Sequence, residues 1–144
     1  MWTRSYSKQV QGLSIAQVWK VWSDVNQWHT WQTDIEYAKM AGEIRVGNSF
    51  LLKPKGGPKV NIEIIRVDHH QNFTDLTRFP FAKMYGAHEL IEHGDALEIK
   101  TTMTVTGPLA FIWKTLVATD IVKGLPEQTD NLIAKVRNDK GIAF

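Results

Sequence analysis

The sequence has no cysteine, little net charge and no long apolar run. The absence of cysteine excludes disulfides, thiolate chemistry and cysteine-ligated zinc, and it is compatible with a reducing compartment. The net charge is only +2, with lysine and arginine scattered, which argues against nucleic acid as a partner. The longest apolar run, Leu109 to Trp113, is far too short to cross a membrane, and the first residues lack the apolar stretch of a signal peptide. We therefore expect a cytoplasmic protein without an integral membrane segment.

The composition that is present indicates a globular chain. It has 144 residues, of which 43% are hydrophobic and 22% charged, so we expect one domain over residues 1–144 with a real core. Six residues are tryptophan, and five of these precede residue 32. They have two interpretations: large rings that fill the core, or an aromatic rim in which Trp28 and Trp31 flank His29 at a cavity mouth.

The N-terminal region predicts a strand followed by two short helices. Thr3 to Gln11 has the β-branched and polar character of an edge strand or a half-exposed strand. Ser14 is a good N-cap, and Gln17 three residues later completes a capping box. The helix that follows has one apolar face, formed by Ile15, Val18, Trp19 and Trp22. Asp24 to Trp31 is expected to be a second short helix or turn, and residues 35–40 a short strand.

The middle of the chain predicts β-hairpins. Their registers follow from pairing of opposite charges and from the placement of apolar residues on one face of the sheet. If residues 60–68 pair with 73–81 across a turn at 69–72, Arg66 faces Asp75 and Glu63 faces Arg78. In the next hairpin, which turns at Gly94-Asp95, His88 faces Thr101. That register also sets Leu90 opposite Ile99, Met84 opposite Val105 and Glu89 opposite Lys100. Both hairpins then present one apolar face.

The turn at Gly56-Gly57 allows two registers. A two-residue turn sets Phe50 against Glu63, whereas a slip of one residue sets Phe50 against Ile62 and Leu52 against Val60. Because the slip changes which face is apolar, we favour a loop of three or five residues.

The last third predicts one long amphipathic helix from Pro108 to Arg137, because its apolar residues recur at helical spacing. Proline is tolerated in the first turn, but Gly124-Leu125-Pro126 should kink or break the helix. Consecutive antiparallel strands with a terminal helix make an α+β fold. A kinked helix on such a sheet leaves a hollow where the two do not meet closely.

Three segments carry a resemblance to a known superfamily. They are Val18 to Trp28 followed by Trp31, Arg45 to Phe50, and Gly107-Pro108-Leu109. This pattern resembles the START-like (SRPBCC) superfamily, which includes lipid-transfer domains, pollen allergens and polyketide cyclases/dehydrases. The resemblance implies the helix-grip fold: a curved antiparallel sheet of about seven strands wrapped around a long C-terminal helix, with two short helices after the first strand. It also implies an apolar ligand between helix and sheet, but it carries over no catalytic motif.

The segment His88-Glu89-Leu90-Ile91-Glu92-His93 resembles a zinc-protease motif without its geometry. That motif needs two histidines four residues apart on a helix. Here the histidines are five apart on a predicted strand, so they point to opposite faces. We therefore expect no metal site, and no feature of the sequence calls for a cofactor.

Two polar features remain as candidates. His88 is predicted to face inward beside Thr101, either as a satisfied core histidine or as a polar anchor or general acid/base. Arg66 and Asp75 form either a structural ion pair or a group that orients a ligand carboxylate or phenol. Asp120 is expected on the solvated face of the long helix.

The leading hypothesis is a module that binds an apolar small molecule or lipid, with no nucleic acid partner. Its predicted site residues are Ile62, Ile64, Arg66, Asp75, Met84, His88, Leu90, Thr101, Met103, Leu109, Trp113 and Leu116. One rival is a polyketide cyclase- or dehydratase-like enzyme that uses His88 or the Arg66/Asp75 pair. Another is a protein-interaction domain of the chaperone-partner or ribosome-associated type, which an exposed patch at Trp28 and Trp31 would favour. The sequence does not indicate an oligomeric state.

Overall fold

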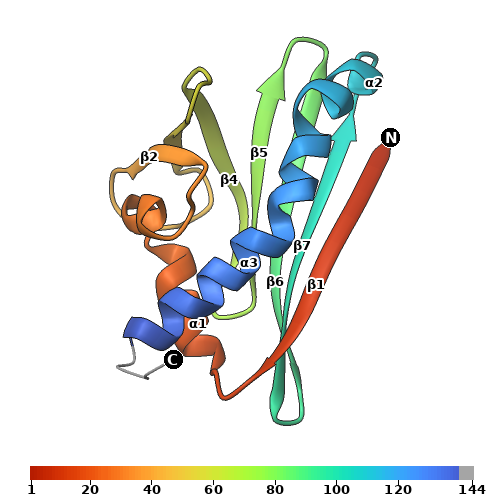
Figure 1. Cartoon of the computed structure of the whole chain (residues 1–144). Helices are drawn as coiled ribbons and strands as arrows, with labels where there is room; N and C mark the ends of the chain where they lie inside the picture. Colours follow the sequence, from red (N-terminus) through yellow and green to blue (C-terminus); the bar gives the residue numbers. More distant parts are fainter. Residues whose placement is uncertain (140–144) are drawn as a thin grey trace.

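A computed structural model describes residues 1–139 as a curved antiparallel sheet that holds a long helix (Figure 1). The sheet order is β1-β7-β6-β5-β4-β3-β2. Its strands are β1 (Trp2–Gln11), β2 (Ile35–Met40), β3 (Ser49–Pro54), β4 (Val60–Asp68), β5 (Asn72–Phe79), β6 (Ala82–His93) and β7 (Ala96–Thr106). The helices are α1 (Ile15–Ser23), the 3-10 helix η1 (Val25–Thr30), α2 (Ala110–Trp113), the π-helical turn η2 (Lys114–Ala118) and α3 (Thr119–Asp139). This is the predicted order of elements.

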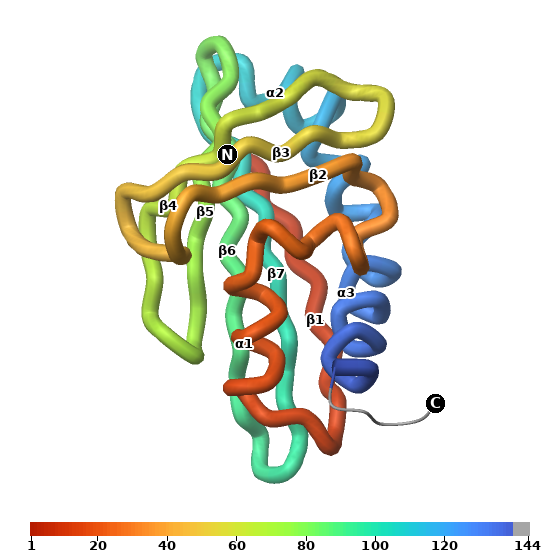
Figure 2. The backbone as a smooth tube through the Cα atoms, turned by 90° about the vertical axis from the view of Figure 1, so that its left-hand side faces the viewer, coloured from red at the N-terminus to blue at the C-terminus, as the bar shows by residue number. Residues whose placement is uncertain are grey.

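The curvature of the sheet is plain when the molecule is turned. Figure 2 shows β2 and β3 running across the direction of β6 and β7, with α1 and α3 inside the bend. The sheet therefore encloses the helices on more than one side. Within residues 1–139, no helix is long and apolar enough to cross a membrane.

The region after β1 folds as its capping signals predict. The Ser14 amide donates to Gln17 Oε1 at 2.9 Å, and the Gln17 amide donates to Ser14 Oγ at 3.3 Å. This capping box fixes the start of α1 and directs Trp19 and Trp22 into the core. The side chain of Asn26 then bonds both the amide and the carbonyl of Met40, which holds η1 on β2.

Two predicted registers are confirmed. In β6 and β7, His88 pairs with Thr101, Leu90 with Ile99 and Met84 with Val105. In β3 and β4, Phe50 pairs with Ile62 across a loop over residues 55–59, the longer alternative. These registers place alternate side chains of β6 and β7 on the inner face.

The predicted register of β4 and β5 is wrong. Asp68 pairs with Asn72, and Arg66 pairs with Thr74, because the turn is one residue shorter than assumed. A bulge between Ile64 and Arg66 adds a second shift. The two shifts together restore the predicted faces of Ile62 and Asp75, but Arg66 lies outside and forms an ion pair with Asp68 at 3.0 Å. The expected Arg66–Asp75 pair does not form.

The Glu63–Arg78 ion pair is present, although the pairing differs from the prediction. Glu63 lies opposite Leu76 in the ladder, and the Arg78 side chain reaches across diagonally to Glu63 Oε1 at 2.9 Å. Diagonal neighbours in a sheet lie within reach of long side chains.

The long helix is interrupted at a different place from the one predicted. It continues through Gly124 and Pro126 without a break, and the irregular turn is η2, which begins ten residues before Gly124. Pro126 is exposed, so water can satisfy the carbonyl of Val122 that loses its partner. In η2 the Thr119 hydroxyl donates to the Lys114 carbonyl at 2.7 Å, which supports the wider turn.

The corner between β7 and α2 sets the direction of the helix. Gly107 has φ of +107°, and a Cβ there would lie 2.7 Å from the carbonyl oxygen of Phe81. Only glycine fits this approach, which lets the Leu109 amide donate to the same carbonyl at 3.1 Å. The Trp113 indole donates to the Pro80 carbonyl at 3.0 Å, and its ring stacks on Phe79. The start of the helix is thus fixed to the β5–β6 turn.

Candidate functional site

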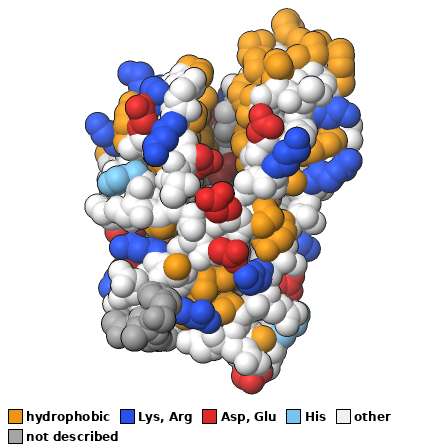
Figure 3. Space-filling view, viewed as in Figure 1, with side chains coloured by type: hydrophobic (Ala, Val, Ile, Leu, Met, Phe, Trp, Pro, Cys, Tyr) orange, Lys and Arg blue, Asp and Glu red, His pale blue; other side chains and the backbone are white. Residues whose placement is uncertain are grey.

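A cavity of about 710 Å³ lies between the long helix and the inner face of the sheet. Figure 3 shows the hollow between the part of the molecule that carries β2 to β4 and the part that carries α2, with acidic side chains along it. The sheet side of the lining includes Phe50, Ile62, Phe73, Met84 and Met103. The helix side includes Trp113, Leu116, Ile121, Leu125 and Leu132. The hollow expected between helix and sheet is therefore present.

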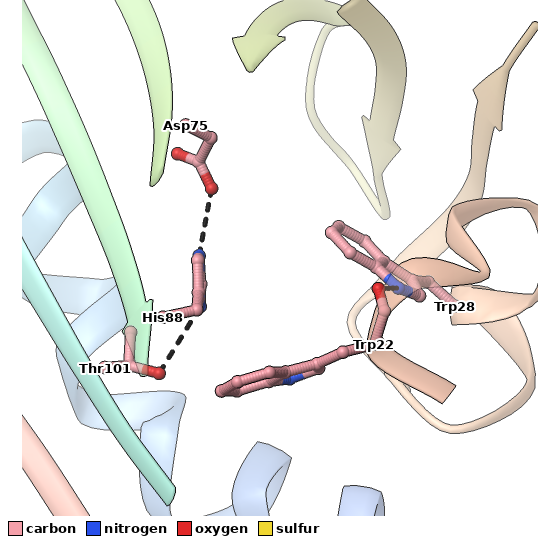
Figure 4. A network of polar contacts seen from close by, with 5 residues as sticks. All are labelled: Trp22, Trp28, Asp75, His88 and Thr101. Atoms are coloured by element: carbon pink, nitrogen blue, oxygen red, sulfur yellow. Dashed lines mark hydrogen bonds and ion pairs between the residues drawn. The ribbon is translucent and has the colours of Figure 1, made fainter. Parts of the chain in front are cut away.

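Three polar side chains from adjacent strands meet at the cavity wall: Asp75 on β5, His88 on β6 and Thr101 on β7 (Figure 4). His88 Nε2 lies 2.9 Å from Asp75 Oδ2, and His88 Nδ1 lies 3.4 Å from Thr101 Oγ1. One neutral tautomer satisfies both contacts: Nε2–H donates to the carboxylate, and Nδ1 accepts from the hydroxyl. His88 therefore orients the Asp75 carboxylate.

Gly86 makes room for the Asp75 carboxylate. Asp75 pairs with Gly86 in the ladder, and its side chain bends over that glycine toward His88. A Cβ at position 86 would lie 2.8 Å from Asp75 Oδ1 and 3.1 Å from Oδ2. Glycine thus suits position 86 because a Cβ has no room there, and not because the backbone needs a conformation that only glycine adopts. Asp75 Oδ1 has no hydrogen-bond partner among residues 1–139, so it is available to a donor in the cavity.

Aromatic rings fix the position of His88. Its imidazole stacks on Phe73 with ring centroids 4.4 Å apart, and it forms a T-shaped contact with Trp22 with ring centroids 5.6 Å apart. The carbonyl of Trp22 in turn accepts a 3.0 Å hydrogen bond from the Trp28 indole. The side chains of His88 and Asp75 are 15% and 13% exposed. The polar group is therefore held rigidly at the border between the core and the cavity.

Most of the predicted site residues line this cavity. They are Ile62, Asp75, Met84, His88, Thr101, Met103, Trp113 and Leu116. Ile64 and Leu90 instead lie in the core, and Leu109 lies at the start of α2, away from the lining. Arg66 lies on the outer face of the sheet for the reason given above. Asp75 thus has His88 as its partner in place of Arg66.

The set of predicted site residues left out most of the aromatic lining, although one interpretation of the sequence placed Trp28 and Trp31 at a cavity mouth. Trp22, Trp28 and Trp31 contribute to it, as do Phe50, Phe73 and the loop from Pro54 to Pro58. Trp28 and Trp31 are each only 5% exposed, so they fill the core as well as line the cavity. The exposed Trp28/Trp31 patch that would favour a protein-interaction domain is absent. The indole nitrogen of Trp31 is buried and has no partner among the described residues.

Two acidic residues at the cavity also escaped prediction as site residues. Asp120 was expected only on a solvated helix face; it is exposed, but it lines the cavity from α3. Asp34, which precedes β2, lines it from the opposite side together with Lys55. Their position depends on how the sheet closes over the helix, which no local pattern reveals.

The two histidines of the His88–His93 segment lie on opposite faces of β6, as predicted. His88 faces the cavity, whereas His93 bonds Glu98 at 2.7 Å with its side chain 46% exposed. Among residues 1–139, no group of three or more acidic or histidine side chains is placed to hold a metal ion.

Comparison with known proteins supports the fold. No family model matches the sequence, and no curated protein matches it. The hypothetical protein jhp0584 from Helicobacter pylori superimposes with a TM-score of 0.76 at 17% identity, over 94% of this chain and 88% of that one. Norcoclaurine synthase from Thalictrum flavum, in complex with dopamine and hydroxybenzaldehyde, gives 0.69 at 15% identity, over 94% and 87%.

Ara h 8.0201 is a third neighbour, with a TM-score of 0.69 at 13% identity, over 94% of this chain and 99% of that one. These similarities span nearly the whole of the chain. At such low identity they establish the helix-grip fold and nothing finer.

Proposed function

We propose that this protein binds an apolar small molecule, lipid-like or aromatic, that carries one polar group. The observation that carries the proposal is the cavity of about 710 Å³, walled mainly by aromatic and aliphatic side chains with Asp75, His88 and Thr101 at one wall. Ligand sites have this composition and fall in the range of about 300 to 1,000 Å³. The apolar walls supply affinity, and the polar wall supplies orientation.

The physical contributions separate by residue. Burial of apolar ligand surface contributes on the order of 25 cal/mol per Å² removed from water. Asp75 Oδ1 can accept a hydrogen bond from the ligand, while His88 holds the carboxylate in place through Oδ2. The neighbour from Thalictrum flavum, bound to two aromatic molecules, supports the idea that this fold can accommodate such ligands.

Native mass spectrometry of freshly purified protein tests the proposal first, by showing whether a small molecule co-purifies. Displacement of the neutral fluorescent probe N-phenyl-1-naphthylamine then gives affinities. We expect His88→Leu to weaken binding of a naphthol by about 5- to 150-fold, since a buried polar group left unsatisfied costs roughly 1–3 kcal/mol. Naphthalene should bind as well or better. Equal affinities of both compounds for both proteins would make His88 a core residue only.

The Asp75–His88 pair favours a second candidate function, an enzyme that moves a proton. A histidine hydrogen-bonded to a carboxylate inside a cavity is a common arrangement for acid/base catalysis. It would serve a cyclase- or dehydratase-like reaction on a polyketide-like substrate.

A ketone probe can separate the two functions without knowledge of the substrate. In D2O, a catalytic base accelerates deuterium incorporation beside the carbonyl of 4-(2-naphthyl)butan-2-one, and NMR follows the exchange. An enzyme should lose about 100-fold of that acceleration in His88→Leu. If the wild-type protein binds the ketone without accelerating its deuterium exchange, the enzyme function is contradicted and only the binding function is supported.

A further inference from the structure

Building on the proposed binding function, we propose that the cavity selects a ligand with a positively charged group, such as an ammonium group on an apolar body. Four formally charged side chains line the cavity: Asp34, Lys55, Asp75 and Asp120. Three carboxylates and one ammonium leave a net charge of −2 there with His88 neutral, whereas the whole chain carries +2. The net charge of the cavity lining is therefore opposite in sign to the net charge of the whole chain.

The unbalanced charge can be assigned to particular residues. The main-chain amide of Lys55 donates to the Asp34 carbonyl at 3.0 Å, so these two residues adjoin at one side of the mouth, where their formal charges sum to zero. Asp120 forms no ion pair with any of residues 1–139, and Asp75 has only the His88 contact. The remaining negative charge thus belongs to Asp75 on the sheet wall and Asp120 on the helix wall.

The surroundings of Asp75 strengthen its effect on a ligand. Its carboxylate is largely shielded from water, and interactions between charges grow as the local dielectric constant falls. One oxygen is free to accept a hydrogen bond from an ammonium group. An anionic ligand would meet this carboxylate at close range, with repulsion in place of a hydrogen bond.

Aromatic side chains of the same lining favour the same sign. Trp22 and Trp28 lie across from Asp75 and His88 in Figure 4, and both line the cavity. Faces of indole rings attract cations, most strongly where water is excluded. A cationic group beside Asp75 can therefore be stabilised by the carboxylate and, where an indole face is within reach, by the ring as well.

Three probes with one alkyl chain test the inference: decylammonium, decan-1-ol and decanoate, each displacing N-phenyl-1-naphthylamine at pH 7 and low salt. We expect decylammonium to bind about 10-fold or more tightly than decanoate, with the alcohol between them, because hydrogen bonds to charged groups are the stronger class. Asp75→Asn and Asp120→Asn should each reduce the ratio of the affinity for decylammonium to the affinity for decanoate. Glu127→Gln, an exposed change on α3 outside the lining, should leave it unchanged.

The outcomes distinguish the inferred charge selection from the proposed binding function on which it rests. Equal binding of the three probes, or tightest binding of decanoate, would overturn the charge selection and leave the binding function standing. Failure of the fluorescent probe and of all three alkyl compounds to bind would overturn both. If Asp75→Asn does not fold, the probe series in the wild-type protein and in Asp120→Asn still decides the question.

Discussion

The inner face of the sheet has a filled half and an open half. In the filled half, α1, η1 and the end of α3 pack large side chains against the strands. These include Val18, Trp19 and Val136, while Trp22, Phe73 and Leu132 also border the cavity. In the open half, η2 and the start of α3 contact β6 and β7 through a small cluster around Ala118, and the cavity remains beside it.

The side chains differ between the halves as well. A second, smaller cluster beside the open half contains Ala82, Met84, Met103, Val105, Ala110 and Ala118. Alanine contributes little volume, and methionine adapts its shape to its surroundings. His88 lies at the border, stacked on Phe73 and bonded to Asp75. The filled half thus provides rigidity, and the open half provides room.

The largest expected effect is on the free energy of unfolding, which should respond differently to substitutions in the filled half and in the open half. Phe73 is 1% exposed and contacts several rings, so Phe73→Ala should lower the free energy of unfolding by about 3–5 kcal/mol. Leu116 is 62% exposed, so Leu116→Ala should change it by less than about 0.5 kcal/mol. Urea denaturation measures both. Similar losses in the two variants would mean that the halves do not differ in packing.

Two glycines give a matched pair of smaller effects. Gly86→Ala forces a Cβ against the Asp75 carboxylate, which we expect to destabilise the protein by about 1–3 kcal/mol and to weaken ligand binding. Gly124 has open space around its Cβ position in α3, so Gly124→Ala should stabilise the protein by about 0.4–1 kcal/mol. Thermal unfolding of the two variants, with probe titrations, compares them. A neutral Gly86→Ala would show that Asp75 does not need its present position.

The smallest expected effect is a pH dependence of stability that arises from the Glu63–Arg78 ion pair on the outer face of the sheet. The Arg78 guanidinium lowers the pKa of Glu63 below its ordinary 4.5, mainly through a hydrogen bond. The folded state then holds the proton less tightly than the unfolded state, so this stabilisation is present above pH 4.5 and is lost as the pH falls through the folded-state pKa. Unfolding midpoints measured at several pH values below 5 should fall less steeply in Glu63→Gln than in the wild-type protein. Parallel slopes would contradict this assignment.

How far the sequence predicts the fold depends on local signals. The β6–β7 register follows from a two-residue turn at Gly94-Asp95 and an unbroken alternation, so it could be derived in full. The β4–β5 register contains a bulge beside Ile64, which alternation alone does not reveal. The shorter turn moves Arg66 opposite Thr74, and the bulge returns Asp75 to the inner face, where His88 on β6 is its partner. The capping box of α1 is local and predictable, whereas the docking of its tryptophans over the cavity depends on contacts distant in the sequence.

The kink is a similar case. Gly124 and Pro126 weaken a helix in isolation, yet the packing of Leu125 and Thr129 maintains α3 through them. The wider turn at η2 depends on a threonine hydroxyl bonded to a carbonyl, a signal with no distinct sequence pattern. Tertiary packing thus maintains the helix at the first position, whereas a local side-chain hydrogen bond supports the wider turn at the second.

The most direct test of the two-halves account uses the four methionines, labelled with 13C at their methyl groups. Met84 and Met103 line the cavity, Met40 lies in the filled half, and Met1 is 95% exposed. Upon titration with decylammonium or decan-1-ol, the NMR signals of Met84 and Met103 should shift and saturate, while those of Met40 and Met1 stay in place. Met84→Leu and Met103→Leu assign the signals. Shifts at Met40 or Met1 alone, or no saturable shift at any methionine, would contradict the account.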